Sequence, residues 1–466
     1  MKRFWALAIA MAALAVWTVP ALAEVKFTGE YRLRAEQASG TDFFDDAEDF
    51  GETDADNIAF YGQRVRLTGV GTAGDDATVK ITLQDTRNWG VSGNQAADSG
   101  PYVDGPALTD SGNTLDLHEA FLQINKFFGT PIALKVGRQE LVYGDQRLIG
   151  SFGWSNQGRS FDALKLMFSN DTVNVDAFTA KIEENNAAAG DSTDDIDFHG
   201  IYATIKSIPN NTLDVYGLLY KDNGSAGLPA WSGGAVKAEV NTYGARLAGN
   251  AVGVDYTAEY ALQSGTFEAP TGGGSDTDVD ASAYAIKAGY TIPNAPVGLR
   301  VGAEYDYASG TDATSTDMET FIQLFPTNHD KYGTMDQQGW SNMKAWNVNV
   351  SAKPTPKLGV RLDYWNFALA EEADGWYSAA GTSGAAGTVR GAGCLVPSGS
   401  DCDAKIGTEV DVTVNYKYSD AIAIQAGVSR FMAGTGLEER VQWSVLDTAA
   451  DTEDMDWMYV QLTANF

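Results

Sequence analysis

The chain is poor in the residues that build metal sites, disulfide frameworks and catalytic centres. Its 466 residues include 2 cysteines and 3 histidines. His118 and His199 fall in segments that read as strands, where a wall position is expected, and His329 falls in a long connection. They show no metal-ligand spacing, and no short nucleophile motif accompanies them. We therefore predict no metal site, no cofactor and no enzymatic activity.

Basic residues are also scarce. The chain has 32 Lys and Arg against 62 Asp and Glu, which gives a net charge of −30. Phosphate binding needs a basic face, so this balance argues against a nucleic-acid partner. The acid is concentrated in Asp42–Asp56 and Glu438–Asp456, which we interpret as solvated surface loops. An alternative is that divalent cations bridge these loops to anionic lipid headgroups.

Long apolar runs are missing except at the start of the chain. Met1–Arg3 is a positive segment, Phe4–Val19 is apolar, and Ala21–Ala23 is a small-residue cleavage site. This pattern predicts a signal peptide over residues 1–23 and a mature chain that starts at Glu24. No later run reaches 18 apolar residues, so no transmembrane helix is expected. A membrane β-barrel would not show such a run, because only alternate residues of its strands face lipid.

The last residues of the chain read as a strand with one apolar face. Met458, Val460, Leu462, Ala464 and Phe466 share that face, and the final residue is aromatic. An exported chain with this ending is typical of a bacterial outer-membrane barrel. The alternative is a soluble periplasmic β-protein with an ordinary last strand.

Segments with a period of two residues recur along the whole chain and number about eighteen, an even number as in single-chain bacterial barrels. Short and long connections alternate between them, which a soluble sandwich gives no reason for. The short ones are expected at Gly71–Asp76, Lys126–Pro131, Ser169–Asp171, Ser207–Asn211, Gly249–Ala251, Thr291–Pro296, Lys353–Pro356 and Lys417–Ala421. We therefore predict one all-β domain over residues 24–466. It is an antiparallel transmembrane barrel with short periplasmic turns, long extracellular loops and both termini on the periplasmic side.

A barrel of eighteen strands encloses a lumen wide enough for water. The early strands would place a row of basic side chains on its wall: Arg32, Arg34, Arg64, Arg66 and Lys80. Glu30, Glu36 and Glu119 lie near enough in the strand order to pair with them. Opposed basic and acidic walls would create a transverse field across the channel, whereas mutual neutralisation would only make the wall rigid.

The connection between the fifth and sixth strands is rich in Arg and Gly. The stretch Val136–Leu166 carries Arg138, Asp145, Arg147, Arg159 and Asp162. One interpretation is a loop that folds inward and constricts the channel. Its arginines would suit the recognition of anions, because the planar guanidinium binds a carboxylate through two hydrogen bonds. The other is an ordered loop whose arginines pair with local carboxylates. Strict alternation would point Arg138 and Asp162 toward lipid, so we expect these two above the membrane or beside a bulge.

Two segments together resemble the alginate-export family of outer-membrane porins: the stretch just described and Phe325–Asp336. The resemblance extends from about Glu30 to Phe466. It implies an eighteen-stranded barrel that passes an anionic uronate polymer through an arginine-lined pore. By match to the family motif it assigns Arg138, Arg147, Arg159 and Asp162 to the pore. The chain departs from the family in its strong acidity, and because its periplasmic turns are all short, no periplasmic plug is evident.

The two cysteines, Cys394 and Cys402, lie close together in a segment rich in Gly and Ser. In an oxidising compartment we expect a local disulfide. A metal site would need two more ligands, and only acidic residues are nearby.

The leading hypothesis is a passive outer-membrane channel for hydrophilic, anionic solutes that works without a cofactor. A second hypothesis is export of an acidic exopolysaccharide such as alginate, with periplasmic export partners. A third is a structural or adhesive barrel with a closed lumen. In each case the barrel contacts outer-membrane lipid.

Overall fold

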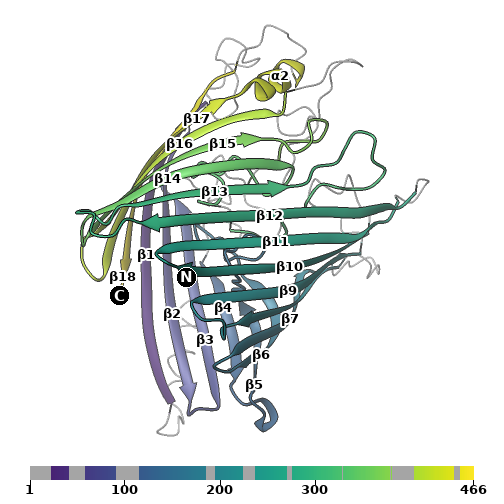
Figure 1. Ribbon diagram of the computed structural model, residues 1–466. Helices are drawn as coiled ribbons and strands as arrows, with labels where there is room; N and C mark the ends of the chain where they lie inside the picture. Colours follow the sequence, from purple (N-terminus) through teal and green to yellow (C-terminus); the bar gives the residue numbers. More distant parts are fainter. Residues whose placement is uncertain are drawn as a thin grey trace.

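The protein is a closed antiparallel β-barrel of 18 strands (Figure 1). The computed structural model describes residues 23–40, 58–90, 115–184, 195–223, 237–269, 275–327, 329–377, 379, 403–444 and 452–466. Each strand pairs with its neighbours in the sequence, and β1 also pairs with β18 from Glu30 opposite Asn465 to Ser39 opposite Asp456. This last pairing closes the sheet, so the barrel has no free edge. The predicted fold class and strand number are confirmed.

The strands are long and their alternation follows the sequence pattern. Their bounds are β1 Ala23–Ser39, β2 Ile58–Ala73, β3 Ala77–Asn88, β4 Leu115–Ile124, β5 Ile132–Gln139, β6 Phe161–Ser169, β7 Val173–Glu183, β8 Ile196–Ile205, β9 Asn211–Asp222, β10 Ala238–Ala251, β11 Val254–Phe267, β12 Thr277–Thr291, β13 Arg300–Ala308, β14 Met343–Thr355, β15 Leu358–Ala368, β16 Lys405–Lys417, β17 Ile422–Ala433 and β18 Met455–Asn465. Each of the eight predicted short connections joins two consecutive strands, within a few residues of its expected place.

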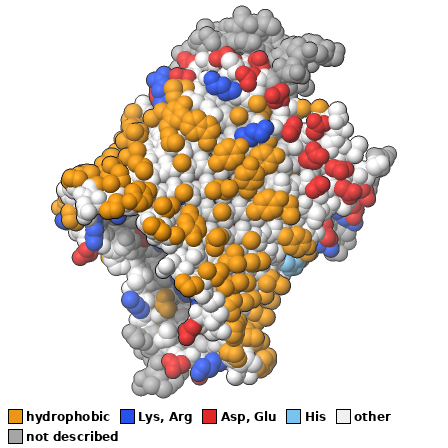
Figure 2. All heavy atoms as spheres, viewed as in Figure 1, with side chains coloured by type: hydrophobic (Ala, Val, Ile, Leu, Met, Phe, Trp, Pro, Cys, Tyr) orange, Lys and Arg blue, Asp and Glu red, His pale blue; other side chains and the backbone are white. Residues whose placement is uncertain are grey.

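The final strand shows how the two faces divide. Met458, Val460 and Leu462 are exposed on the outside, whereas Trp457 and Tyr459 are buried on the inside. The same alternation gives the barrel an apolar outer surface, and Figure 2 shows hydrophobic side chains spread over it with acidic side chains gathered toward one edge. An apolar exterior around a polar interior is what a lipid environment requires of a spanning barrel.

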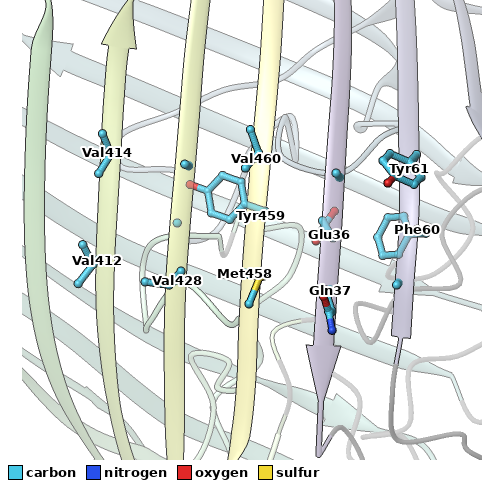
Figure 3. A pocket seen from close by; sticks show the side chains of 14 residues that line it. Glu36, Gln37, Phe60, Tyr61, Val412, Val414, Val428, Met458, Tyr459 and Val460 are labelled. Atoms are coloured by element: carbon cyan, nitrogen blue, oxygen red, sulfur yellow. The ribbon is translucent and has the colours of Figure 1, made fainter.

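A shallow groove of about 360 Å³ crosses this outer surface where β16, β17 and β18 meet β1 and β2. Val412, Val414, Val428, Met458 and Val460 line it (Figure 3). The groove is hollow because the residues at its floor are small: Ala35, Ala59, Ala426 and Gly427. Because it lies on the apolar exterior, the groove faces the membrane and is separate from the lumen.

Helices play a minor part. The described residues include the one-turn η2 (Phe127–Gly129) and α2 (Thr435–Ser444), neither of which the sequence pattern predicted. The second occupies the start of a connection that we expected to be loop throughout. Neither is long and apolar enough to cross a bilayer.

Candidate channel constriction

Two long connections from opposite parts of the chain meet inside the barrel. We call residues 140–160, between β5 and β6, the first lumen loop, and residues 309–327 and 329–342, between β13 and β14, the second lumen loop. Ile149 and Phe325 form a parallel bridge between them. The amide of Gly150 donates to the carbonyl of Phe325 at 2.8 Å, and the amide of Phe325 donates to the carbonyl of Leu148 at 2.9 Å. The two segments that carry the family resemblance therefore contact each other.

The first lumen loop reaches both sides of the lumen. On one side its backbone at Gly153–Gln157 binds side chains of β1, β2 and β3. On the other side Asp145 pairs with Arg246 of β10 and Lys287 of β12. In a closed ring of 18 strands, β1 lies opposite β10. The loop therefore crosses the lumen and narrows it, in agreement with the first of the two interpretations drawn from the sequence.

Four arginines of the basic row hold this loop through its carbonyl oxygens, and we call them the arginine cluster. Arg32 donates to Gly153 O at 2.9 Å and Ser155 O at 2.7 Å, and Arg64 donates to the same two oxygens at 3.1 and 3.0 Å. The other two members are Arg34, which donates to Trp154 O at 2.7 Å, and Arg66, which donates to Gln157 O at 3.3 Å. The guanidinium of Arg34 also lies 3.9 Å above the Trp154 ring.

Carboxylates neutralise only part of this cluster. Arg64 pairs with Glu30 at 2.8 Å, Arg34 pairs with Glu36 at 2.5 Å, and Arg66 pairs with Glu140 at 3.7 Å. The contacts of Arg32 to the loop are with two carbonyls and an amide oxygen, which carry no net charge. The predicted pairing with Glu30 and Glu36 is therefore present but incomplete.

Arg147 and Arg159 bind the far side of the lumen and the second loop. Arg147 is buried, pairs with Glu304 and with Asp306 at 3.2 Å, and lies over the rings of Tyr332 and Trp340. Arg159 donates to Pro326 O at 2.7 Å. Both arginines therefore fix the two loops in place, which the sequence interpretation of local carboxylate pairing captured only in part.

Asp145 is held as an anion at the centre of this arrangement. Burial alone would raise the pKa of its carboxyl, but the ammonium of Lys287 and the guanidinium of Arg246 outweigh burial and hold the pKa at about 2. The distance from Asp145 to Lys287 is 2.6 Å.

Arg138 and Asp162 do not join the constriction. They lie opposite each other on β5 and β6 and form a two-pronged ion pair with both distances at 3.0 Å. They share a face with Val136 and Leu164, which are exposed on the outside of the barrel. Strict strand alternation continues to the ends of these strands, so it carries both side chains outward. Their assignment to the pore, carried over by motif, is corrected by this placement.

Lys80 lines a polar hollow of about 470 Å³ in the lumen wall, together with Arg66, His118, Glu119 and Glu140. Lys80 pairs with Glu119, and His118 lies 2.8 Å from Glu140. The ladder between β3 and β4 shifts register at Thr82, so two successive residues, His118 and Glu119, both reach the interior. A bulge of this kind re-aims side chains in a way that strict alternation cannot predict.

Of the other two histidines, one lies on a strand and one in the second lumen loop. His199 contacts Thr179 at 2.9 Å on the neighbouring strand. His329 stacks on Trp154 with ring centres 3.7 Å apart and lies 2.8 Å from Asp336. Trp154 thus lies between Arg34 on the wall and His329 on the second lumen loop.

Buried acidic side chains line the rest of the lumen wall, and sequence reasoning had not singled them out. The buried members of this group are Glu259, Asp306, Asp363, Glu409 and Asp411, on β11 to β16. Their positions in the alternating strands pointed inward, but nothing local marked them as a group. The lumen therefore has a side rich in arginine and a side rich in carboxylate, and each also carries some charges of the opposite sign. The cysteines Cys394 and Cys402 lie outside the described residues.

Comparison with known proteins agrees with this architecture. The sequence model described as Alginate export matches residues 24–449. No curated protein sequence matches the chain. Among solved structures, OccK9 (OpdG) of Pseudomonas aeruginosa is similar with a TM-score of 0.58 at 12% identity, over 95% of this chain and 99% of that chain. OccAB4 of Acinetobacter baumannii is similar with a TM-score of 0.54 at 13% identity, over 95% and 98%.

A third structure, OccK11 (OpdR) of Pseudomonas aeruginosa, gives a TM-score of 0.53 at 12% identity over 94% of this chain and 96% of that chain. At these identities the structures establish the common barrel fold. The family match covers most of the chain and describes export rather than an enzymatic reaction, so the expectations of family, outer-membrane location and non-enzymatic function are confirmed. The chain belongs to the Alginate export family and is an outer-membrane β-barrel channel.

Proposed function

We propose that the channel passes hydrophilic, anionic solutes by diffusion along the arginine side of its lumen. The observation that carries this proposal is the arginine cluster, whose positive charge is only partly offset by nearby carboxylates. Hydrogen bonds to carbonyl oxygens hold the guanidinium groups but leave their charge in place. Charges on the wall of a narrow aqueous passage bias which ions enter.

On the arginine side of the lumen, Lys80 and Arg66 are more exposed than the other members of the basic row, with side chains 30% and 16% exposed. Lys80 pairs with Glu119, and Arg66 lies 3.7 Å from Glu140. They lie together in the polar hollow beside the first lumen loop. The carboxylates on the rest of the lumen wall and the acidic loops oppose anion entry, so a passing anion would stay close to the arginine cluster.

Reversal potentials in a salt gradient test the proposal. The wild-type channel is expected to prefer anions, and R66Q/K80Q is expected to lower that preference, most at low salt where screening is weakest. K417Q, which removes one charge from an exposed periplasmic turn, is the matched control. Clear cation selectivity in the wild type, left unchanged by R66Q/K80Q, would refute anion passage.

Family membership favours a second candidate, the export of an acidic exopolysaccharide with periplasmic partners. Block of the open channel by an acidic oligosaccharide, weakened in R147S/R159S, supports this candidate. Block by small anions but not by the oligosaccharide supports diffusion of small solutes. Absence of any conductance supports the third hypothesis, a barrel with a closed lumen.

A further inference from the structure

The second lumen loop docks on the inner wall through a short turn. The amide of Met335 donates to Glu409 Oε1 at 2.9 Å. The hydroxyl of Thr334 donates to Asp411 Oδ1 at 2.6 Å and lies 2.7 Å from Ser429 Oγ. Two residues of the turn therefore bind two carboxyl groups of β16 and a hydroxyl of β17.

The turn fits closely against the carboxyl group of Glu409. Gly333 has a φ of +82°, and a Cβ atom placed on it would lie 2.5 Å from both carboxyl oxygens of Glu409. A larger residue would therefore both strain the backbone and clash with the carboxyl group. The geometry of the turn is adapted to this contact.

Glu409 and Asp411 form a buried carboxyl pair. They are two residues apart on β16, so they point to the same face, and their exposed fractions are 0% and 1%. Each uses one oxygen to bind the turn. The second oxygens, Glu409 Oε2 and Asp411 Oδ2, are buried and have no hydrogen-bond partner. No ion pair within the described part of the chain includes either residue.

The surroundings supply no compensating cation. Across the ladders, Glu409 faces the buried rings of Trp365 and Phe431, and Asp411 faces Asp363 and Ser429. The nearest arginine on β15, Arg361, pairs with Asp363 at 2.6 Å.

The second lumen loop adds one more carboxyl group, that of Asp336. Burial raises the pKa of this carboxyl group, and His329, 2.8 Å away, opposes the rise. Both partners of the carboxyl pair therefore lie in an environment of apolar rings, hydroxyls and further carboxyl groups.

Two adjacent buried carboxylates without a cation repel each other and lose their hydration, so the pair favours binding one proton. A shared proton would lie between the two unpartnered oxygens and provide each with a hydrogen-bond partner. The two remaining oxygens would stay available to Met335 and Thr334.

We propose that Glu409 and Asp411 form a proton-binding site that holds the second lumen loop across the lumen, and that loss of the proton in alkaline solution releases the loop and widens the channel. The ligand is the proton itself. Release follows because two buried negative charges repel each other and draw water into the contact with the turn. This inference does not depend on which solute the channel passes.

Single-channel conductance across a pH series from about 6 to 9.5 tests the proposal. Conductance of the wild type is expected to rise by roughly twofold or more as the pH increases. E409Q keeps the acceptor for Met335 and adds a donor toward Asp411, so it imitates the protonated pair and should hold the low conductance at every pH. G333A should show the high conductance at every pH. D255N, which removes a lumen carboxylate that pairs with Arg300, should keep the wild-type pH response.

Hydrogen exchange at the Met335 amide gives a second readout that needs no current. Relative to E409Q at the same pH, the wild type should lose protection by about tenfold or more in alkaline solution, the effect of losing one hydrogen bond to a charged group. D411N is a second imitation of the protonated pair and should match E409Q. Equal protection in the wild type and both variants across the series, or a pH response that survives in E409Q, would overturn the proposal.

Discussion

Loss of Arg32 and Arg64 should release the first lumen loop from the wall. These two residues donate to Gly153 O and Ser155 O, and Arg32 also donates to Asn156 Oδ1 at 2.9 Å. The variant R32M/R64M keeps apolar stems of similar length and removes all five contacts. It also leaves the two carbonyl oxygens without these donors.

The size of the effect follows from the number and kind of hydrogen bonds. A hydrogen bond to a charged group contributes about 1.5–3 kcal/mol, but bonds that share acceptors are not additive. We therefore expect docking of the loop to weaken by about 3–5 kcal/mol. At about 1.4 kcal/mol per factor of ten, the undocked fraction rises roughly 100- to 4,000-fold.

Single-channel recording can detect a change of this size. R32M/R64M should show larger current fluctuations and visits to a higher conductance level, because the loop no longer stays across the lumen. R300M is the control, since Arg300 faces the lumen but binds Asp255 on β11 and Asn349 on β14 rather than the first lumen loop. If R32M/R64M records like R300M and its loop keeps full protection from hydrogen exchange, the arginine cluster does not hold the loop.

Four further outcomes are expected. Unboiled protein should migrate differently from boiled protein on a detergent gel, because a closed barrel satisfies its backbone hydrogen bonds between strands; equal migration with recovery in the soluble periplasmic fraction would contradict the membrane barrel. Peptide mapping without reductant should find Cys394 joined to Cys402, and two freely alkylated thiols would refute this disulfide. The pKa of about 2 for Asp145 lies below its unfolded value of about 3.9, so its stabilisation is present above pH 4 and is lost as the pH falls toward 2; loop protection that is unchanged at about pH 2.5 would exclude this ion pair as a support. V252N should raise the free energy of unfolding by about 1 kcal/mol, measured by denaturant titration, because Val252 has a φ of +53° in a two-residue turn that favours asparagine; no gain would show that the turn is unstrained.

The strands were predictable because the membrane imposes one rule on all of them. Lipid outside and water inside require apolar and polar side chains to alternate along each strand. The outward position of residues such as Met458 and Val460 can therefore be predicted from their own strand alone. The short turns were predictable for a related reason, since Pro, Asn, Asp and Gly occupy them and the connections alternate in length. Both signals are local, and the order of an up-and-down barrel needs no long-range information.

The constriction was predictable only in part, because its contacts join residues far apart in the chain. Alternation placed Arg32 and Arg64 on the inner wall, but their partners are the backbone carbonyl oxygens of Gly153 and Ser155. Every residue type has a backbone carbonyl, so the sequence does not indicate which of them accept these hydrogen bonds. Alternation also pointed Arg138 outward, and the motif match alone assigned it to the pore. The alternation of its strand points Glu409 inward, but its contact with Met335 joins residues 74 apart in the chain and depends on the path of the whole second lumen loop.

The arginine cluster both makes the lumen rigid and provides a positive field, two roles that the sequence interpretation treated as alternatives. A guanidinium that donates to a carbonyl oxygen is satisfied as a hydrogen-bond donor, so it can hold the first lumen loop in one position. The carbonyl carries no net charge, however, so the field of the guanidinium still extends into the passage beside the loop. Had carboxylates taken those positions, the loop would be held equally well and the field would be cancelled. Holding the loop through its backbone therefore fixes the shape of the constriction while keeping its wall positive, and R32M/R64M should change conductance and anion preference together.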